Sequence, residues 1–145
     1  MVNSDMASVR AAKYEDRERL LEMCLEFAVE YGFVPSPDRI LSVIDSLAAG
    51  EDSALLVTNT LDGVIGLVAK VHPFGEDVMA QEIVWWVDPA ARKNGTGTKL
   101  LRAAEDWARD RGAKTMLMVA PNDAVGLYYN SIGYKPFETF WKRSL

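Results

Sequence analysis

The middle of the chain changes from helical to strand periodicity, and this change constrains the fold more than any other feature. Three segments rich in Val, Ile, Leu and Trp, at 54–57, 64–71 and 78–87, are separated by the short turns 59–63 and 73–77. A parallel pair of strands requires a crossover of about a dozen residues or more, and neither turn is that long. We therefore expect an antiparallel meander of three strands.

Helical patterns and further short strands flank this meander. We expect helices over 14–30, between the cap Ser36 and Gly50, over 96–111 and over 123–132, and strands over 8–11, 115–120 and 137–142. The order β, α, α, three β, α, β, α, β predicts a mixed α/β (α+β) sheet with four helices packed on its faces. The length of 145 residues suits a single domain over 1–145, with the polar residues 1–7 disordered.

Composition excludes several classes of protein. Hydrophobic residues make up 49% and charged residues 26%, as in a soluble globular protein, and the apolar run 83–87 is too short to cross a membrane. The start of the chain has no export signal, so we expect a cytoplasmic protein. A net charge of −5 without a block of like charges argues against a nucleic-acid partner.

The sequence offers little to a metal ion or to a covalent mechanism. Cys24 is the single cysteine and lies in an apolar helical pattern, so we expect a buried thiol. His72 is the single histidine and precedes Pro73 at the end of a strand, where we interpret it as a turn residue. We predict no metal site, and a covalent enzyme intermediate has little support.

The segment Arg92, Lys93, Asn94, Gly95, Thr96, Gly97 and Thr98 joins the third meander strand to an amphipathic helix. The first turn of a helix exposes unpaired N–H groups at the positive end of the helix dipole, and this attracts phosphate oxygens. The two glycines let a phosphate approach the backbone, the two cations add charge, and the threonine hydroxyls are further donors. The segment therefore predicts an anion-binding loop.

Two well-known phosphate loops do not fit this segment. A P-loop requires Lys directly after its second glycine, where this chain has Thr98, and the Rossmann pattern requires a third glycine where it has Leu100. On its own, the glycine pair also fits an ordinary strand-to-helix turn.

The stretch RKNGTG at 92–97 fits the R-x-x-G-x-G motif of the GNAT acetyltransferases (GCN5-related N-acetyltransferases). The segment 122–134 resembles the second signature of that family, an Asn, a Tyr seven residues on, and Gly followed by an aromatic residue. The resemblance covers nearly the whole chain. It implies a mostly antiparallel sheet that splays between its fourth and fifth strands, with the pantetheine arm of acetyl-CoA in the gap and the diphosphate on the amides of 94–98. Homodimers are common in the family, although no feature of this sequence demonstrates one.

Glu82 is the leading candidate for a general base. An alkyl amine is almost fully protonated at neutral pH, so a base helps its attack on a thioester. A carboxylate within an apolar strand is costly unless it is hydrogen-bonded or functional, and Glu82 matches a strand-four glutamate that some members of the family use. The alternative is that Glu82 faces solvent or pairs with Lys70. By alternation we expect Glu82 to share a sheet face with Val84 and Trp86, opposite Trp85.

Three other residues complete the predicted site. Tyr129 lies four residues before Gly133 and seven after Asn122, which is the family's spacing for a general acid that protonates the coenzyme thiolate; Tyr128 is the packing alternative. The resemblance also implies that the main-chain N–H of Val87 stabilises the developing oxyanion. Asn122 is assigned to the coenzyme site, with a helix cap as its alternative role.

Two functions follow from this interpretation. The first is an N-acetyltransferase that moves the acetyl group of acetyl-CoA directly to a primary amine, on a small molecule or on a protein. The second is a non-catalytic module of the same fold that binds or senses acyl-CoA. The sequence does not identify the acceptor, although Tyr31 and Phe33 are candidates for the wall of its pocket.

Overall fold

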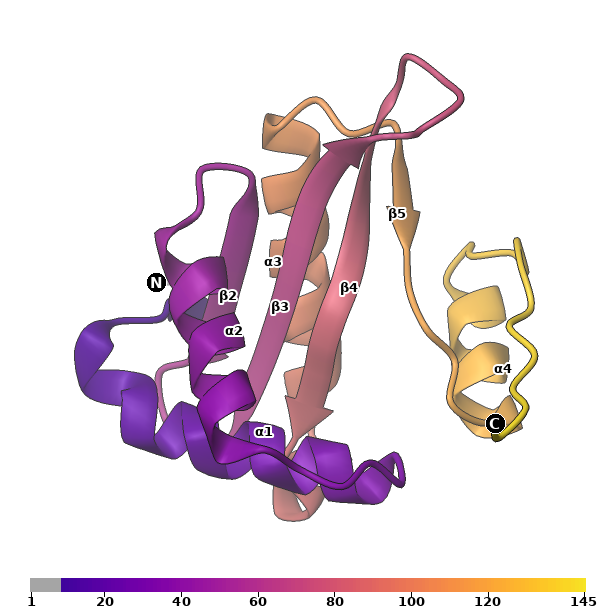
Figure 1. Cartoon of the computed structure of the whole chain (residues 1–145). Coiled ribbons are helices and arrows are strands. Elements are labelled where there is room, and N and C mark those ends of the chain that lie inside the picture. Colours follow the sequence, from indigo (N-terminus) through magenta and orange to yellow (C-terminus); the bar gives the residue numbers. More distant parts are fainter. Residues whose placement is uncertain (1–8) are drawn as a thin grey trace.

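A computed structural model describes residues 9–145 (Figure 1), so the disorder predicted for residues 1–7 and the first residue of the strand predicted at 8–11 lie outside the described part. Within residues 9–145 five strands form one sheet in the order β1-β2-β3-β4-β5, and every neighbouring pair is antiparallel except β4 and β5. The strands are β1 Val9–Ala11, β2 Ser53–Thr58, β3 Gly63–Val71, β4 Val78–Val87 and β5 Thr115–Leu117. The predicted meander is therefore confirmed as β2, β3 and β4.

In the described part of the chain four α-helices accompany the sheet, as predicted. They are α1 Arg17–Glu30, α2 Pro37–Ala49, α3 Thr96–Asp110 and α4 Asp123–Ser131, with short 3-10 turns at Tyr14–Asp16 and Pro89–Ala91. Ser36 caps α2 by accepting a hydrogen bond from the Arg39 N–H, and Pro37 takes the first helical position, where its missing N–H costs nothing. Figure 1 shows α1 and α2 on one face of the sheet and α3 on the other.

Each face of the sheet has its own apolar core. Leu20, Met23 and Leu47 from α1 and α2 pack on Val64 and Trp86, whereas Leu100, Leu101 and Ala104 from α3 pack on Ile65, Leu67 and Val87. Trp86 belongs to the first core and Trp85 to the second, so the two tryptophans point to opposite faces, as predicted.

A β-bulge in β4 corrects the predicted side-chain pattern. Gly66 pairs with Val84 but the next residue, Leu67, pairs with Glu82, so Ile83 is the extra residue. Directly opposed side chains share a face, and Leu67 packs in the α3 core. Glu82 therefore lies on the α3 face with Trp85, and the prediction that it shares a face with Val84 is wrong because the bulge shifts the alternation.

The parallel pair β4–β5 is short, and this produces the predicted splay. β5 pairs only with the first part of β4, from Met79 to Gln81, and the chain then departs from the sheet towards α4. The strand predicted over 115–120 is accordingly limited to Thr115–Leu117.

The final strand predicted at 137–142 is wrong. In the described part of the chain no residue after α4 belongs to a strand. A strand needs a neighbouring edge, and the chain leaves α4 without reaching the free edge of β5 (Figure 1). Pro136 also has no N–H to donate at the start of this segment.

Candidate active site

Glu82 lies where β5 leaves β4, and its side chain is only 6% exposed. Its Oε1 atom accepts a hydrogen bond of 3.1 Å from the main-chain N–H of Val119. Burial disfavours the charged carboxylate and raises the pKa of Glu82 to about 7, although the Val119 N–H opposes this by stabilising the charge. Glu82 is therefore neither a solvent-facing residue nor the partner of Lys70, and it titrates in the range that suits a general base near neutral pH.

Tyr129 reaches the same peptide from α4. Its hydroxyl donates a hydrogen bond of 3.1 Å to the main-chain oxygen of Val119. The ring is buried and stacks on Trp85 with 5.8 Å between ring centroids. Burial, and then the nearby charge of Glu82, hold the pKa of Tyr129 well above its usual value, so the hydroxyl keeps its proton at neutral pH. The structure thus brings the two predicted catalytic residues together around Val119.

Tyr128 points to a different place. Its hydroxyl lies 2.7 Å from the Thr98 hydroxyl, in the first turn of α3, and the two oxygens share a hydrogen bond. Consecutive helical residues project about 100° apart, so the adjacent tyrosines reach separate parts of the site. Tyr128 contacts the predicted anion-binding loop, and Tyr129 contacts the Glu82 region.

The N-terminus of α3 has the geometry of an anion-binding loop. Gly95 precedes the helix with a φ of 84°, a conformation that favours glycine, and no side chain caps the helix. The Thr96 hydroxyl donates a hydrogen bond to the side-chain oxygen of Asn94 at 2.6 Å. These two side chains therefore pair with each other and not with the N–H groups of the first turn. A Cβ atom at Gly97 would lie 3.3 Å from the Trp85 ring, which shows how closely this turn packs on β4. Lys93 is exposed beside the turn.

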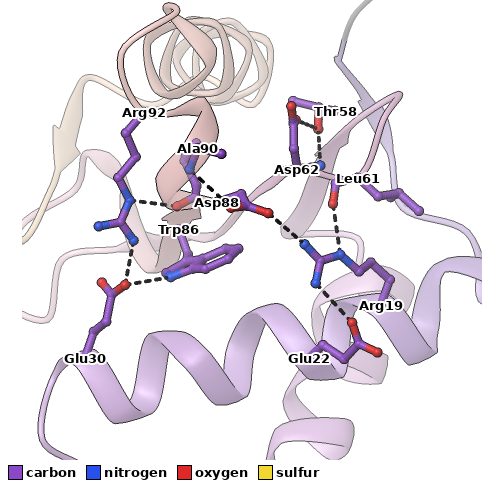
Figure 2. Close-up of polar contacts among 11 residues, drawn as sticks. Arg19, Glu22, Glu30, Thr58, Leu61, Asp62, Trp86, Asp88, Ala90 and Arg92 are labelled. Atoms are coloured by element: carbon purple, nitrogen blue, oxygen red, sulfur yellow. Dashed lines mark hydrogen bonds and ion pairs between the residues drawn. The ribbon is translucent and has the colours of Figure 1, made fainter.

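Arg92 is directed towards α1, as Figure 2 shows. Its Nε donates to the main-chain oxygen of Val87 at 2.8 Å, and one Nη donates to Glu30 at 2.6 Å. Glu30 also accepts from the Trp86 indole N–H at 3.3 Å. Arg92 therefore attaches the start of the loop to the end of α1, and its contact with a phosphate stays a prediction.

A second group of contacts in Figure 2 fixes the same loop from the other side. Arg19 donates to the main-chain oxygen of Leu61 at 3.1 Å and pairs with Asp88 at 3.5 Å. Asp88 caps the turn after β4 by accepting from the Ala90 N–H. Contacts at both sides make α1 a support for the loop that follows β4.

The direction of the Val87 peptide follows from the strand register. The Asp88 N–H donates to the main-chain oxygen of Asp62 at 2.8 Å, just outside the ladder pair Val87 and Gly63, so this ladder pair is a non-hydrogen-bonded one. The Val87 N–H consequently points away from β3, towards the side where β5 has diverged. The role of this N–H as an oxyanion donor stays a prediction.

The structure also shows where the other residues singled out in the sequence lie. Asn122 caps α4 by accepting from the Val125 N–H at 3.0 Å, which is its alternative role. His72 accepts from the Phe74 N–H within the β3–β4 turn, and Cys24 is buried, both as expected. Tyr31 lies close enough to Glu82 for the carboxylate charge to raise the pKa of its hydroxyl, after the larger effect of burial.

Three features of the site have no signal in the sequence. Val119 contributes only main-chain atoms, and the contact between Tyr128 and Thr98 joins residues 30 positions apart. Trp85 was expected in the core, but its indole N–H is buried without a hydrogen-bond partner among residues 9–145, beside Gly97 and Tyr129. This donor would be found only from the packing of α3 on β4.

The described part of the chain has no group of three or more side chains suited to hold a metal ion. Within the same residues, no helix is long and apolar enough to span a membrane.

The sheet splays beside a buried carboxylate and an uncapped helix behind a glycine turn, and the splay and the glycine turn are features that the family resemblance implied. The chain belongs to the GNAT acetyltransferases, because the sequence model of the "Acetyltransferase (GNAT) family" matches residues 21–134. This membership supports acyltransferase activity, and the family implies acetyl-CoA as the acyl donor.

Individual relatives agree with this assignment. The chain is 35% identical over 66 residues to an aminoglycoside N(6')-acetyltransferase type 1 of Klebsiella aerogenes, a match that covers 41% of this chain and 43% of that protein. The fold of this chain is similar to that of a transcriptional regulator from Bacillus halodurans C-125, whose crystal structure matches with a TM-score of 0.77 and 18% identity over 95% of this chain and 99% of that one. It is also similar to an aminoglycoside antibiotic 6'-N-acetyltransferase from Acinetobacter haemolyticus (TM-score 0.74, 18% identity, 94% and 97%). At such identities the two structures show the fold alone.

Proposed function

We propose that this chain is an N-acetyltransferase that moves an acetyl group from acetyl-CoA to a primary amine by direct attack in a ternary complex. The observation that carries the proposal is the pair Glu82 and Tyr129, which hydrogen-bond the N–H and the C=O of the same residue, Val119. One group has a pKa of about 7 and the other stays protonated, so a proton acceptor and a proton donor lie together at the splay.

The residues fit an acyl-CoA co-substrate. The uncapped first turn of α3 leaves N–H donors for the diphosphate, Gly97 lets that turn pack closely on Trp85, and the hydroxyls of Thr98 and Tyr128 lie beside the turn. The co-substrate supplies the thioester carbonyl that the amine attacks. Lys93, Asn94, Gly95 and Thr96 complete the proposed binding loop, and Arg92 and Asn122 support it through the contacts described above.

Each protein group then has one task. Glu82 takes a proton from the amine, the N–H of Val87 stabilises the negative charge that develops on the carbonyl oxygen, and Tyr129 gives its proton to sulfur as the carbon–sulfur bond breaks. The products are an acetylated amine and free coenzyme A. A primary amine is also the group that the name of the Klebsiella aerogenes relative indicates, so an aminoglycoside belongs among the acceptors to be tried.

The test measures free thiol released from acetyl-CoA with a panel of an aminoglycoside, a polyamine, and peptides with a free α-amine or lysine. We expect turnover with at least one acceptor, and a fall of about 100-fold or more in kcat for Tyr129→Phe at unchanged affinity for acetyl-CoA. Tyr134→Phe is the matched control, since Tyr134 also loses a hydrogen bond, to Glu105, and its ring contacts Tyr129. Binding of acetyl-CoA without turnover on any acceptor would replace this proposal with the non-catalytic module.

A further inference from the structure

We propose that Trp85 binds the pantetheine arm of acetyl-CoA, with its indole N–H donating a hydrogen bond to an oxygen atom of the arm. This inference rests on the proposed use of acetyl-CoA and adds a side chain of β4 to the proposed binding site. Three features carry it: the donor is unpaired, its ring spans the proposed site, and the arm carries the kind of acceptor that the donor lacks.

The indole N–H of Trp85 is a buried donor without a partner. No group within residues 9–145 accepts a hydrogen bond from it. A buried tryptophan usually finds a partner for this N–H, because burial removes its hydrogen bonds to water. The adjacent Trp86 follows the rule, since its indole N–H donates to Glu30. The unpaired donor at Trp85 therefore calls for a ligand that supplies the acceptor.

The Trp85 ring extends between the two places that the proposed function assigns to the ends of the arm. Its face stacks on Tyr129, the proposed acid for the sulfur, with 5.8 Å between ring centroids. Its nitrogen-bearing edge faces the first turn of α3, because a Cβ atom at Gly97 would lie 3.3 Å from Cζ2 and 3.8 Å from Cε2, the carbon bonded to Nε1. The pantetheine arm joins the sulfur to the diphosphate, so an arm with these two ends passes along the Trp85 ring.

The chemistry of the arm complements this donor. Pantetheine is uncharged and carries amide oxygens and a hydroxyl, all of which accept hydrogen bonds. A neutral N–H set in an aromatic surface suits such groups, as single polar atoms in apolar pockets orient their ligands. The main-chain N–H groups of the first turn of α3 instead suit the charged diphosphate. The two parts of the coenzyme thus meet two kinds of donor.

The arm gains this donor without displacing another acceptor. Tyr128 and Tyr129 contact the Trp85 ring as aromatic neighbours, and their hydroxyls bond to Thr98 and to the main chain of Val119. Uncovering the nitrogen requires a shift of neighbouring side chains and breaks no hydrogen bond of the indole. A donor that is unpaired in the free protein and paired in the complex strengthens binding more than an exposed donor, which gives up a bond to water.

The first experiment follows the indole N–H signals by NMR. The chain has four tryptophans, so the isotope-labelled protein gives four such signals, and Trp85→Phe identifies the signal of Trp85 by its loss. Saturating acetyl-CoA should move that signal downfield, as a new hydrogen bond does. The Trp107 signal should stay in place, because Trp107 lies about three turns along α3 from Gly97. A Trp85 signal that does not move while acetyl-CoA binds overturns the proposal.

The second experiment separates the arm from the diphosphate. Phosphopantetheine carries the arm without the nucleotide, and ADP carries a diphosphate without the arm. In NMR titrations, Trp85→Phe should bind acetyl-CoA and phosphopantetheine about 10-fold more weakly than wild type and bind ADP equally well. Trp107→Phe is the matched control, since Trp107 is also half-buried against the α3 core, and it should bind all three ligands as wild type does.

The outcomes distinguish this proposal from the proposed acetyl transfer. Equal losses for ADP and phosphopantetheine in Trp85→Phe would show that the substitution disturbs the first turn of α3, and they overturn the contact with the arm. Normal turnover with an unmoved Trp85 signal removes the contact alone. A wild-type chain that shows the expected Trp85 shift but acetylates no acceptor keeps the contact and removes the transfer.

Discussion

Replacing Glu82 with Gln should abolish most activity and yet stabilise the protein at alkaline pH. The folded-state pKa of Glu82 is about 7, and the pKa of an unstructured glutamate is near 4.5. The folded carboxyl therefore holds its proton over a pH range in which the unfolded chain releases it. Stability that is present below about pH 4.5 is lost as the pH rises towards 7, and the loss is complete above 7.

The magnitude follows from the two pKa values. A difference of about 2.5 units corresponds to about 3 kcal/mol of unfolding free energy between acid and alkaline solution, of which about 2 kcal/mol falls between pH 5.5 and 8. A glutamine has no charge to desolvate, and its side-chain oxygen still accepts from the Val119 N–H. We therefore expect Glu82→Gln to lack this pH dependence and to be the more stable protein at pH 8.

The assay is urea unfolding of wild type and variant at pH 5.5 and pH 8, with Glu51→Gln, an exposed carboxylate, as the control for loss of one charge. The same proteins are assayed for acetyl transfer, where Glu82→Gln should be slower by about 100-fold or more, and wild-type kcat/KM should fall below pH 7 as Glu82 is protonated. If the unfolding free energies of wild type and Glu82→Gln changed with pH in the same way, the claim that Glu82 is buried with a raised pKa would be refuted. A Glu82→Gln enzyme of normal rate would refute its role as the base.

Three further substitutions test other parts of the structure. Tyr128→Phe removes the hydroxyl that meets Thr98 and should weaken acetyl-CoA binding about 5-fold or more in calorimetry, with kcat nearly unchanged; an unchanged Kd would contradict this. Gly97→Ala places a methyl group 3.3 Å from the Trp85 ring, on the turn where the diphosphate is proposed, and should both lower Tm and raise the Kd for acetyl-CoA; a lower Tm with an unchanged Kd would indicate a purely structural glycine. Leu100→Ala empties a fully buried position between α3 and the sheet and should cost about 2–5 kcal/mol of unfolding free energy, measured in urea.

The sequence predicted those parts of the fold that short-range rules determine. The meander follows from turns too short for a crossover, and the ends of α2 follow from Ser36, Pro37 and Gly50, each of which acts on neighbouring backbone groups. The glycine turn before α3 was found in the same way. The family resemblance added the splay, which depends on contacts between distant segments and has no local signal.

The errors arose where packing decides between local alternatives. Strict alternation assigns Glu82 and Val84 to one face of the sheet, but the bulge at Ile83 puts them on opposite faces. No residue type in this segment indicates a bulge. The segment 137–142 has strand-forming residues, yet a strand exists only beside a partner edge, and sequence periodicity does not say whether the fold brings the segment to such an edge. The place of Val119 in the site could not be predicted from the sequence either, because Val119 contributes only its main-chain N–H and C=O.

The early separation of β5 from β4 creates the place of the proposed chemistry. After Gln81 and Leu117 the ladder ends, and the Val119 N–H that would otherwise continue towards β4 is donated to the Glu82 carboxylate. Its C=O accepts from Tyr129, so a peptide released from the sheet holds both titratable groups. The same departure leaves β5 with three residues and, among residues 9–145, without a neighbouring strand on its outer side, beside a cavity of about 680 Å³. A longer β4–β5 ladder would pair the Val119 peptide with β4 and remove the place for Glu82, so the short pairing is the physical condition for the site.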